Sequence, residues 1–101
     1  MNRPLIVLPD AQVDIGIICC DLEQMRTGLG RKFIAELKVV LERIESMPEL
    51  HGIVWKDVRA VRVRKFQYIV YYVVFDDRVE VLAVIHGARD SAVWQARVSN
   101  S

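Results

Sequence analysis

Hydrophobic residues recur at spacings of three and four in the first half of the chain and in nearly unbroken runs in the second half. An apolar run at 5–8 predicts a first strand, and Pro9 suits the first turn of a helix that extends to about Arg26. Asp10 and Asp14 are expected near the positive end of this helix's dipole. The predicted apolar stripe comprises Ile15, Ile18, Leu22 and Met25, widened by Ile17 and Cys20.

A second helical pattern begins near Gly30 and ends before Pro48. Charged residues occupy the side opposite its apolar stripe, which indicates an amphipathic helix with one buried face. Thr27-Gly28 is a stop signal between the two helices, and so short a link predicts an antiparallel helical hairpin. The stripe of the second helix comprises Phe33, Leu37, Val40, Ile44 and Met47.

Three strand-like runs follow a predicted loop at 49–57. The run at 59–64 alternates between valines and arginines, which is typical of a strand with one solvent face. The run at 68–75 is apolar on both faces and is expected to be a central strand, and the third run spans 79–86. Residues 91–97 predict one more helical turn, with Asp90 or Ser91 as its cap.

The order β-αα-βββ predicts an α+β fold in which a helical hairpin packs on a mostly antiparallel sheet. At 101 residues the chain is expected to form a single domain over 1–101, and no repeat or linker divides it. A chain of this size can bury roughly 65% of the surface that its unfolded form exposes, which is enough for one core.

Net charge and cysteine content limit the kinds of partner and the cellular compartment that we expect for this protein. The formal net charge is only +1, so any surface for an anionic partner must be local. Cys19 and Cys20 are adjacent on a predicted helix, which disfavours a disulfide and favours a reduced, cytoplasmic protein. The N-terminal apolar run is too short for a signal peptide, and no run approaches the ~20 apolar residues of a membrane span.

Two small groups of residues are candidates for chemistry. Arg62 and Arg64 share the polar face of a predicted strand, where two guanidinium groups can bind phosphate; exposed strand charges that protect a sheet are the alternative. His86 ends the last strand and Arg89 follows it, so the pair offers proton transfer and charge stabilisation for RNA cleavage. The alternative for His86 is a structural bond to the backbone where the sheet ends.

The sequence offers no cofactor or metal motif. His51, His86 and the two cysteines lack the paired spacing of zinc ligands, and no glycine-rich phosphate loop is present. Trp55 and Trp94 can stack on bases, but such residues more often cover a core or a partner surface. We therefore expect no cofactor and no metal.

The chain resembles the RelE/ParE superfamily of bacterial toxins, whose members are often described as plasmid stabilisation proteins. The resemblance covers nearly the whole chain and rests on the order of several loose motifs. These motifs are Ala11-x-x-Asp14-Ile15, Gly30-x-x-Phe33-x-x-x-Leu37, Ile44-x-x-x-Pro48, Val58-Arg59, Phe66-x-Tyr68-x-Val70-x-Tyr72 and Val81-x-x-Val84-x-His86-x-x-Arg89-Asp90.

This resemblance implies a small cytoplasmic toxin of a type II toxin–antitoxin system, neutralised by a cognate antitoxin protein in a hetero-oligomer. RelE-like members cut mRNA in the ribosomal A site with a basic cluster and often a tyrosine near the C-terminus. ParE-like members inhibit DNA gyrase and lack nuclease activity. Arg62, Arg64 and Arg89 fall in the region of the RelE-like cluster, but Trp94 stands where that tyrosine would lie.

Three hypotheses follow for the function. The first is a ParE-like toxin that binds a target such as gyrase, and the second is a ribosome-dependent mRNA endonuclease that uses Arg62, Arg64, His86 and Arg89. The third is a domain that keeps the fold and antitoxin binding without toxicity. The ending His86-Gly87-Ala88-Arg89-Asp90 and the low net charge favour the ParE-like branch.

Overall fold

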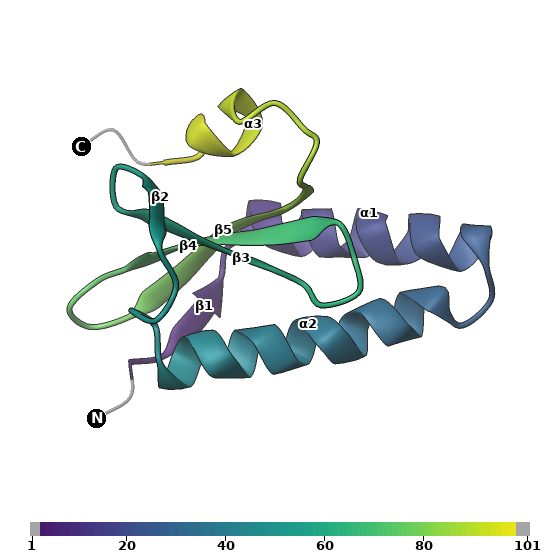
Figure 1. Cartoon of the computed structure of the whole chain (residues 1–101), viewed down its shortest axis with the longest axis horizontal. Coiled ribbons are helices and arrows are strands. Elements are labelled where there is room, and N and C mark those ends of the chain that lie inside the picture. Colours follow the sequence, from purple (N-terminus) through teal and green to yellow (C-terminus); the bar gives the residue numbers. More distant parts are fainter. Residues whose placement is uncertain (1–2, 99–101) are drawn as a thin grey trace.

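The computed structural model describes residues 3–98, in which a sheet lies between a helical hairpin and a short C-terminal helix (Figure 1). We call the side of the sheet covered by the two long helices the hairpin face, and the other side the α3 face. The elements are β1 (Leu5–Val7), α1 (Pro9–Met25), α2 (Leu29–Ser46), β2 (Ile53–Trp55), β3 (Val58–Arg62), β4 (Tyr68–Val74), β5 (Val79–His86) and α3 (Ala92–Gln95).

The sheet has five strands in the order β1-β5-β4-β3-β2. β1 pairs parallel with β5 and every other pairing is antiparallel, so the predicted mostly antiparallel sheet is confirmed. β4 lies at the centre, as its two apolar faces predict. The predicted α+β class is likewise confirmed, and the predicted elements occur in the expected order, with one further strand, β2, between α2 and β3.

The prediction of an uninterrupted loop at 49–57 is wrong, because β2 lies inside it at the sheet edge. β2 forms a hairpin with β3 in which Trp55 is paired with Val58. Lys56 makes the tight turn with a left-handed backbone, at φ 50°. Three apolar residues are too few to show the alternation of apolar and polar positions that is typical of a strand. This segment forms a strand only because it pairs with β3.

Helix α1 buries less of its predicted stripe than expected. Ile18 and Leu22 are buried, together with Ala11, which contacts the same core. The predicted positions of Met25 and Ile17 are wrong, since their side chains are 75% and 56% exposed. The core lies on one side of α1 only, so apolar side chains at other angles remain in solvent.

The two long helices meet closely at their connection. Gly28 adopts a left-handed backbone at φ 88°, which favours glycine. The carboxylate of Glu23 accepts hydrogen bonds from the backbone N–H groups of Gly28 (2.7 Å) and Gly30 (3.1 Å). A side chain at Gly30 would place its Cβ only 2.7 Å from the carbonyl oxygen of Cys19. The turn is therefore capped by α1 itself and requires a small residue at Gly30.

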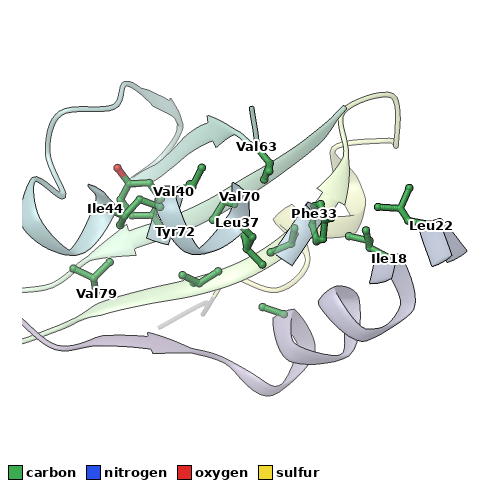
Figure 2. Close-up of a cluster of buried hydrophobic side chains, with 13 residues drawn as sticks. Ile18, Leu22, Phe33, Leu37, Val40, Ile44, Val63, Val70, Tyr72 and Val79 are labelled. Carbon is green, nitrogen blue, oxygen red and sulfur yellow. The ribbon is translucent and has the colours of Figure 1, made fainter. Parts of the chain in front are cut away.

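The main core lies between the hairpin and the sheet (Figure 2). Helix α2 contributes Phe33, Leu37, Val40 and Ile44, none more than 4% exposed, as their helical spacing predicts. They pack with buried residues of the sheet that include Val63, Val70, Tyr72, Val79, Val81 and Val84. Met47 does not join them and is 53% exposed, because α2 ends at Ser46.

A second, smaller core lies on the α3 face. Trp94 of α3 packs there with Val58, Leu82, Ala83 and Ile85. The predicted helical turn at 91–97 is thus confirmed in part as α3, and Asp90 Oδ1 accepts the N–H of Ala92 at 2.9 Å. Burial of Trp94 holds α3 over the sheet (Figure 1). Arg97, which follows α3, donates a hydrogen bond to Asp14 of helix α1.

Candidate functional site

His86 holds together the turn that ends β5. Its Nδ1 accepts the backbone N–H of Ala88 at 3.0 Å, and its carbonyl accepts the N–H of Arg89 at 3.0 Å. Its ring meets the ring of Tyr68 edge-on, with centroids 5.4 Å apart. The lone pair of Nδ1 is therefore engaged in the turn. This is the structural role that the sequence analysis gives as the alternative to catalysis.

Arg89 lies with His86 at a small cavity of about 190 Å³ between β5, α1 and the C-terminal segment. Helix α1 contributes two carboxylates to its lining, those of Asp14 and Asp21, and Arg97 adds a second guanidinium group. The cavity therefore combines His86 and Arg89 with acidic groups. A phosphate placed here would meet two carboxylates as well as two cations.

Arg62 lies on the opposite side of the sheet from His86. It pairs with Ile69 of β4, which pairs with Ile85 of β5, whereas His86 pairs with Tyr68. Paired residues point to the same face and successive residues alternate. The side chains of Arg62 and His86 consequently leave the sheet on different faces, so the structure does not bring together the whole predicted set.

Arg64 lies in the turn between β3 and β4, because β3 ends at Arg62. The expectation that both arginines lie on one strand is wrong, and Lys65 adopts a left-handed backbone in this turn, at φ 72°. Both guanidinium groups are on exposed residues. Within residues 3–98, neither forms an ion pair with a carboxylate, so both are available to an anionic group of a partner.

Arg59, the third cation of this part of the sequence, has a structural role. Its Nη1 donates to the carbonyl oxygens of His51 (2.6 Å) and Glu49 (3.3 Å). Strand alternation also directs it to the face opposite that of Arg62. Arg59 anchors the segment between α2 and β2. It is not part of the exposed positive surface that Arg62 and Arg64 form.

Trp94 fills the place at which a RelE-like tyrosine is expected. Its ring stacks on Tyr71, with centroids 4.4 Å apart, and meets Trp55 edge-on at 5.8 Å. Trp94 is 5% exposed and so covers a core, the more common of the two roles expected for it. Burial raises the pKa of Tyr71, and this neighbouring phenol therefore stays protonated near neutral pH.

A salt bridge that the sequence analysis missed joins the two ends of the domain. Asp14 accepts two hydrogen bonds from Arg97, at 2.5 and 3.1 Å, and a third from the backbone N–H of Val84 at 3.0 Å. Arg97 also donates to the carbonyl of Leu82 at 3.2 Å. Hydrogen bonding to Asp14 raises the pKa of Arg97, which stays charged. The only sign of this salt bridge in the sequence is Asp14 itself, an acidic residue beside the buried apolar stripe of α1.

The expected place of Asp14 near the start of the helix dipole is wrong. Asp10 alone lies in the first turn of α1, and Asp14 lies one turn further along. β1 ends at Val7, so the following part of β5 has no strand beside it on that edge. Asp14 and Arg97 supply the hydrogen bonds that a neighbouring strand would provide there.

The largest cavity among those described lies on the α3 face, with a volume of about 550 Å³. Its apolar lining includes Val58, Val73 and Leu82, and charged side chains of both signs surround it, among them Lys56 and Glu80. Within residues 3–98, no cluster of three or more metal-binding side chains occurs. In the same range, no helix has the length and apolar character needed to cross a membrane.

Comparisons with known proteins agree with the fold. A family model described as the ParE toxin of the type II toxin–antitoxin system parDE matches residues 20–91. A solved structure of a chromosomal ParDE toxin–antitoxin system from P. aeruginosa is similar, with a TM-score of 0.75 and 10% sequence identity. The match covers 83% of this chain and 95% of that chain. A comparison with curated proteins found no match.

Proposed function

The chain belongs to the ParE toxin family of type II toxin–antitoxin systems, and from this premise we propose that it arrests growth by binding DNA gyrase, without cutting mRNA. Gyrase is the target that the resemblance to ParE-like toxins implies. Binding of this kind needs a complementary surface and no proton transfer. We also propose that the toxin acts in the cytoplasm, where gyrase and DNA are found.

The observation that carries this proposal is the separation of Arg62 from His86 on opposite faces of the sheet. Cleavage of RNA by its 2′-hydroxyl needs proton transfer and charge stabilisation around one phosphate. Nδ1 of His86 is occupied by the N–H of Ala88, and the buried Trp94 has no group that exchanges a proton near neutral pH. These features favour a binding toxin.

The ribosome-dependent mRNA endonuclease remains the second candidate. One observation favours it, because His86 and Arg89 line the same cavity. In that mechanism His86 would exchange the proton and Arg89 would stabilise the developing charge. Arg62 and Arg64 would then bind the RNA backbone away from the reacting phosphate. A domain without toxicity that retains antitoxin binding is the third candidate.

Membership of a type II toxin–antitoxin family implies an antitoxin partner. We propose that the antitoxin supplies acidic groups to the exposed Arg62 and Arg64 and forms a hetero-oligomer with the toxin. Such contacts at the rim of an interface weaken as salt is raised. A double variant, Arg62→Glu with Arg64→Glu, should therefore bind the antitoxin more weakly and with less dependence on salt. Equal binding by the two proteins would contradict this docking surface.

Two assays on the same protein distinguish the candidates. Purified toxin is added to DNA gyrase in a supercoiling assay, and mRNA 5′ ends are mapped after induced expression in a bacterium. The proposal expects inhibited supercoiling and no new 5′ ends within ribosome-bound codons. The reverse pattern would identify the endonuclease. If neither effect appears although the antitoxin binds, the chain is a non-toxic domain.

A further inference from the structure

The charges of this chain are unevenly distributed, although its formal net charge is only +1. Residues 24–35 and 58–75 contain no aspartate or glutamate, yet together they hold seven of the chain's 14 lysines and arginines. The first stretch includes the link between α1 and α2, and the second covers β3 and β4. A molecule that is nearly neutral as a whole can therefore present a strongly positive local surface.

The fold brings these two stretches together at one end of the molecule. Phe33 follows Lys32 in α2, and its ring meets the ring of Phe66 edge-on, with centroids 5.3 Å apart. Phe66 follows Lys65 in the β3–β4 turn, and its N–H donates to the carbonyl of Val63 at 3.0 Å, which closes the turn. The β3–β4 turn and the link between α1 and α2 both lie to the right in Figure 1. The cations of the turn are thus held beside the first turns of α2.

Lys32 lies on the flank of α2 that faces β3. Arg43 is eleven positions further along α2, which is about three helical turns, so the two side chains share one flank. Burial lowers the pKa of His51, and the charges of Arg43 and of Arg59 in β3 lower it further, so this flank lies near β3. Arg31, one position before Lys32, is turned about 100° round the helix and away from this flank.

Four cations of this region are available to an anion, and we call Lys32, Arg62, Arg64 and Lys65 the basic end. Arg62 ends β3, and Arg64 and Lys65 lie in the turn that follows. All four residues are exposed, and within residues 3–98 none of them forms an ion pair. The cavities described above are lined by none of them. They therefore form an open surface and not a pocket for a small anion.

Acidic groups lie at the opposite end of the sheet. The β4–β5 turn contains Asp76 and Asp77 and lies to the left in Figure 1. β4 has seven residues and connects this turn to the β3–β4 turn, so about 23 Å separate the two turns. The protein is thus electrically polarised, and a polyanion would be attracted to the basic end and repelled by the β4–β5 turn.

The aromatic rings near the basic end are not available to bases. Phe66 and Tyr68 both meet the ring of Phe33 edge-on, with centroids 5.3 and 5.4 Å apart, and both pack against the main core. Proteins that bind single-stranded nucleic acid combine cations with aromatic rings on which bases stack. Exposed cations without such rings suit the phosphate backbone of a duplex, whose contacts carry no sequence information.

We propose that the basic end, formed by Lys32, Arg62, Arg64 and Lys65, binds the phosphate backbone of double-stranded DNA without sequence preference. The setting rests on the proposed function, because the toxin would contact the DNA segment that gyrase holds. The DNA contact itself belongs to the toxin alone and is measured without gyrase. Arg62 and Arg64 are also the residues proposed to receive acidic groups of the antitoxin, so DNA and antitoxin would compete for the same cations.

The salt dependence of DNA binding counts the phosphates that the toxin neutralises. For a duplex, the slope of log K against log salt is about −0.9 per phosphate, so four contacts give a slope of about −3.6. Doubling the salt concentration should then weaken binding by roughly tenfold. The measurement is fluorescence anisotropy of two short labelled duplexes of unrelated sequence, titrated with the full-length toxin. We expect equal affinity for the two duplexes and this slope for both.

A double variant with a matched control tests which cations are responsible. Arg64→Gln with Lys65→Gln should weaken binding to both duplexes and make the slope shallower by about 1.8. Lys38→Gln with Lys56→Gln removes the same charge from exposed positions outside the basic end and should leave the slope unchanged. The control also matches the backbone, because Lys56 and Lys65 are both left-handed, at φ 50° and 72°. Circular dichroism and thermal unfolding verify that both variants are folded.

A supercoiling assay separates this proposal from the proposed function. With gyrase and DNA present, Arg64→Gln with Lys65→Gln should require a higher toxin concentration for inhibition than the control does. Wild type that binds DNA with the expected slope but leaves gyrase active would contradict the gyrase target and support the basic end. Wild type that inhibits gyrase but does not bind DNA would support the gyrase target and overturn the basic end.

Three further outcomes would overturn the proposal. A wild-type slope shallower than about −1 would show that no more than one phosphate is neutralised. Equal slopes in the Arg64→Gln, Lys65→Gln variant and in the control would show that the basic end is not the contact. Tighter binding to single-stranded RNA than to either duplex would identify RNA, and not DNA, as the ligand of these cations.

Discussion

Asp14 and Arg97 are 83 positions apart in the sequence and form a two-bond salt bridge across the exposed edge of β5. Asp14 accepts the N–H of Val84, and Arg97 donates to the carbonyl of Leu82. The two side chains thereby satisfy backbone groups that β1 is too short to reach. They also fasten the C-terminal segment to α1, beside the cavity that contains His86 and Arg89.

Replacing Asp14 by alanine should destabilise the protein by about 1.5–3 kcal/mol, because the N–H of Val84 and the charge of Arg97 lose their partner. Arg97→Ala should have a smaller effect, since Val84 keeps its hydrogen bond. Urea unfolding of both single variants and the double variant gives the coupling energy, expected at about 0.5–3 kcal/mol. Strictly additive effects would show that the salt bridge contributes nothing.

The sequence predicts a long amphipathic helix better than it predicts contacts between distant segments. The spacing of Phe33, Leu37, Val40 and Ile44 indicates the buried face of α2, because one helix contains the whole pattern. β2 has only three residues and is formed by its pairing with β3. Asp14 and Arg97 show no periodic signal, since their relationship depends on where two distant segments meet.

The candidate site is less predictable than the fold. The sequence places His86 at a strand end and Arg62 on a strand, and both positions are confirmed. Their relative orientation depends on the register between β3, β4 and β5, and a shift by one residue would exchange the faces. Whether Arg62, Arg64, His86 and Arg89 act in toxicity stays a prediction.

Gly30 sets the distance between the two long helices. In Gly30→Ala, the new Cβ would lie 2.7 Å from the carbonyl oxygen of Cys19, so the helices must move apart. We expect a loss of about 1–3 kcal/mol in the free energy of unfolding. Gly16→Ala is the control, because its Cβ meets nothing within 4 Å; it should stabilise the helix by about 0.5–1 kcal/mol. Equal changes in the two variants would contradict this account.

Leu37 lies at the centre of the contact between α2 and the sheet (Figure 2) and is 3% exposed. Leu37→Ala should reduce the free energy of unfolding by about 2–5 kcal/mol, through lost apolar burial and the cavity that remains. Val39→Ala, on the exposed side of the same helix, should change it by no more than about 0.5 kcal/mol. An unchanged denaturation midpoint in Leu37→Ala would rule out the assigned core.

His51 should make the protein less stable in mild acid. Burial lowers its pKa from 6.5, and the charges of Arg43 and Arg59 lower it further. Within residues 3–98, its buried Nε2 has no hydrogen-bond partner. The folded state therefore favours the neutral ring, and the unfolded chain takes up a proton more readily. The contribution of the neutral His51 ring to stability is fully present above pH 6.5. It is lost as the pH falls below 6.5 and through the lower pKa of the folded state.

The test is to compare wild type with His51→Gln by denaturant unfolding at about pH 7.5 and about pH 5.5. Carboxylates contribute equally to the pH dependence of both proteins. The difference in their loss of stability on acidification therefore reports the His51 imidazole alone. Wild type should lose more stability on acidification than His51→Gln. If both proteins lose the same amount, protonation of His51 is not linked to unfolding.

Arg89 should contribute more to toxicity than Cys19, Cys20 or His51. It follows the last strand in a short turn and lines the cavity that also contains His86. In a nuclease, loss of a group that stabilises developing phosphate charge typically lowers the rate by about 10²–10³. In a gyrase inhibitor, Arg89 would be an interface arginine, a residue type enriched among strong contacts. Arg89→Ala should therefore reduce growth inhibition under either mechanism.

The two mechanisms differ in what they require of His86. A nuclease needs its capacity for proton transfer, so His86→Gln should abolish mRNA cleavage in a folded protein. A gyrase inhibitor should tolerate that change, since the glutamine amide oxygen can also accept a hydrogen bond in the turn. Arg31→Ala, an exposed arginine on α2, serves as the control for loss of positive charge. A folded Arg89→Ala protein that remained as toxic as Arg31→Ala would exclude Arg89 from the site under both mechanisms.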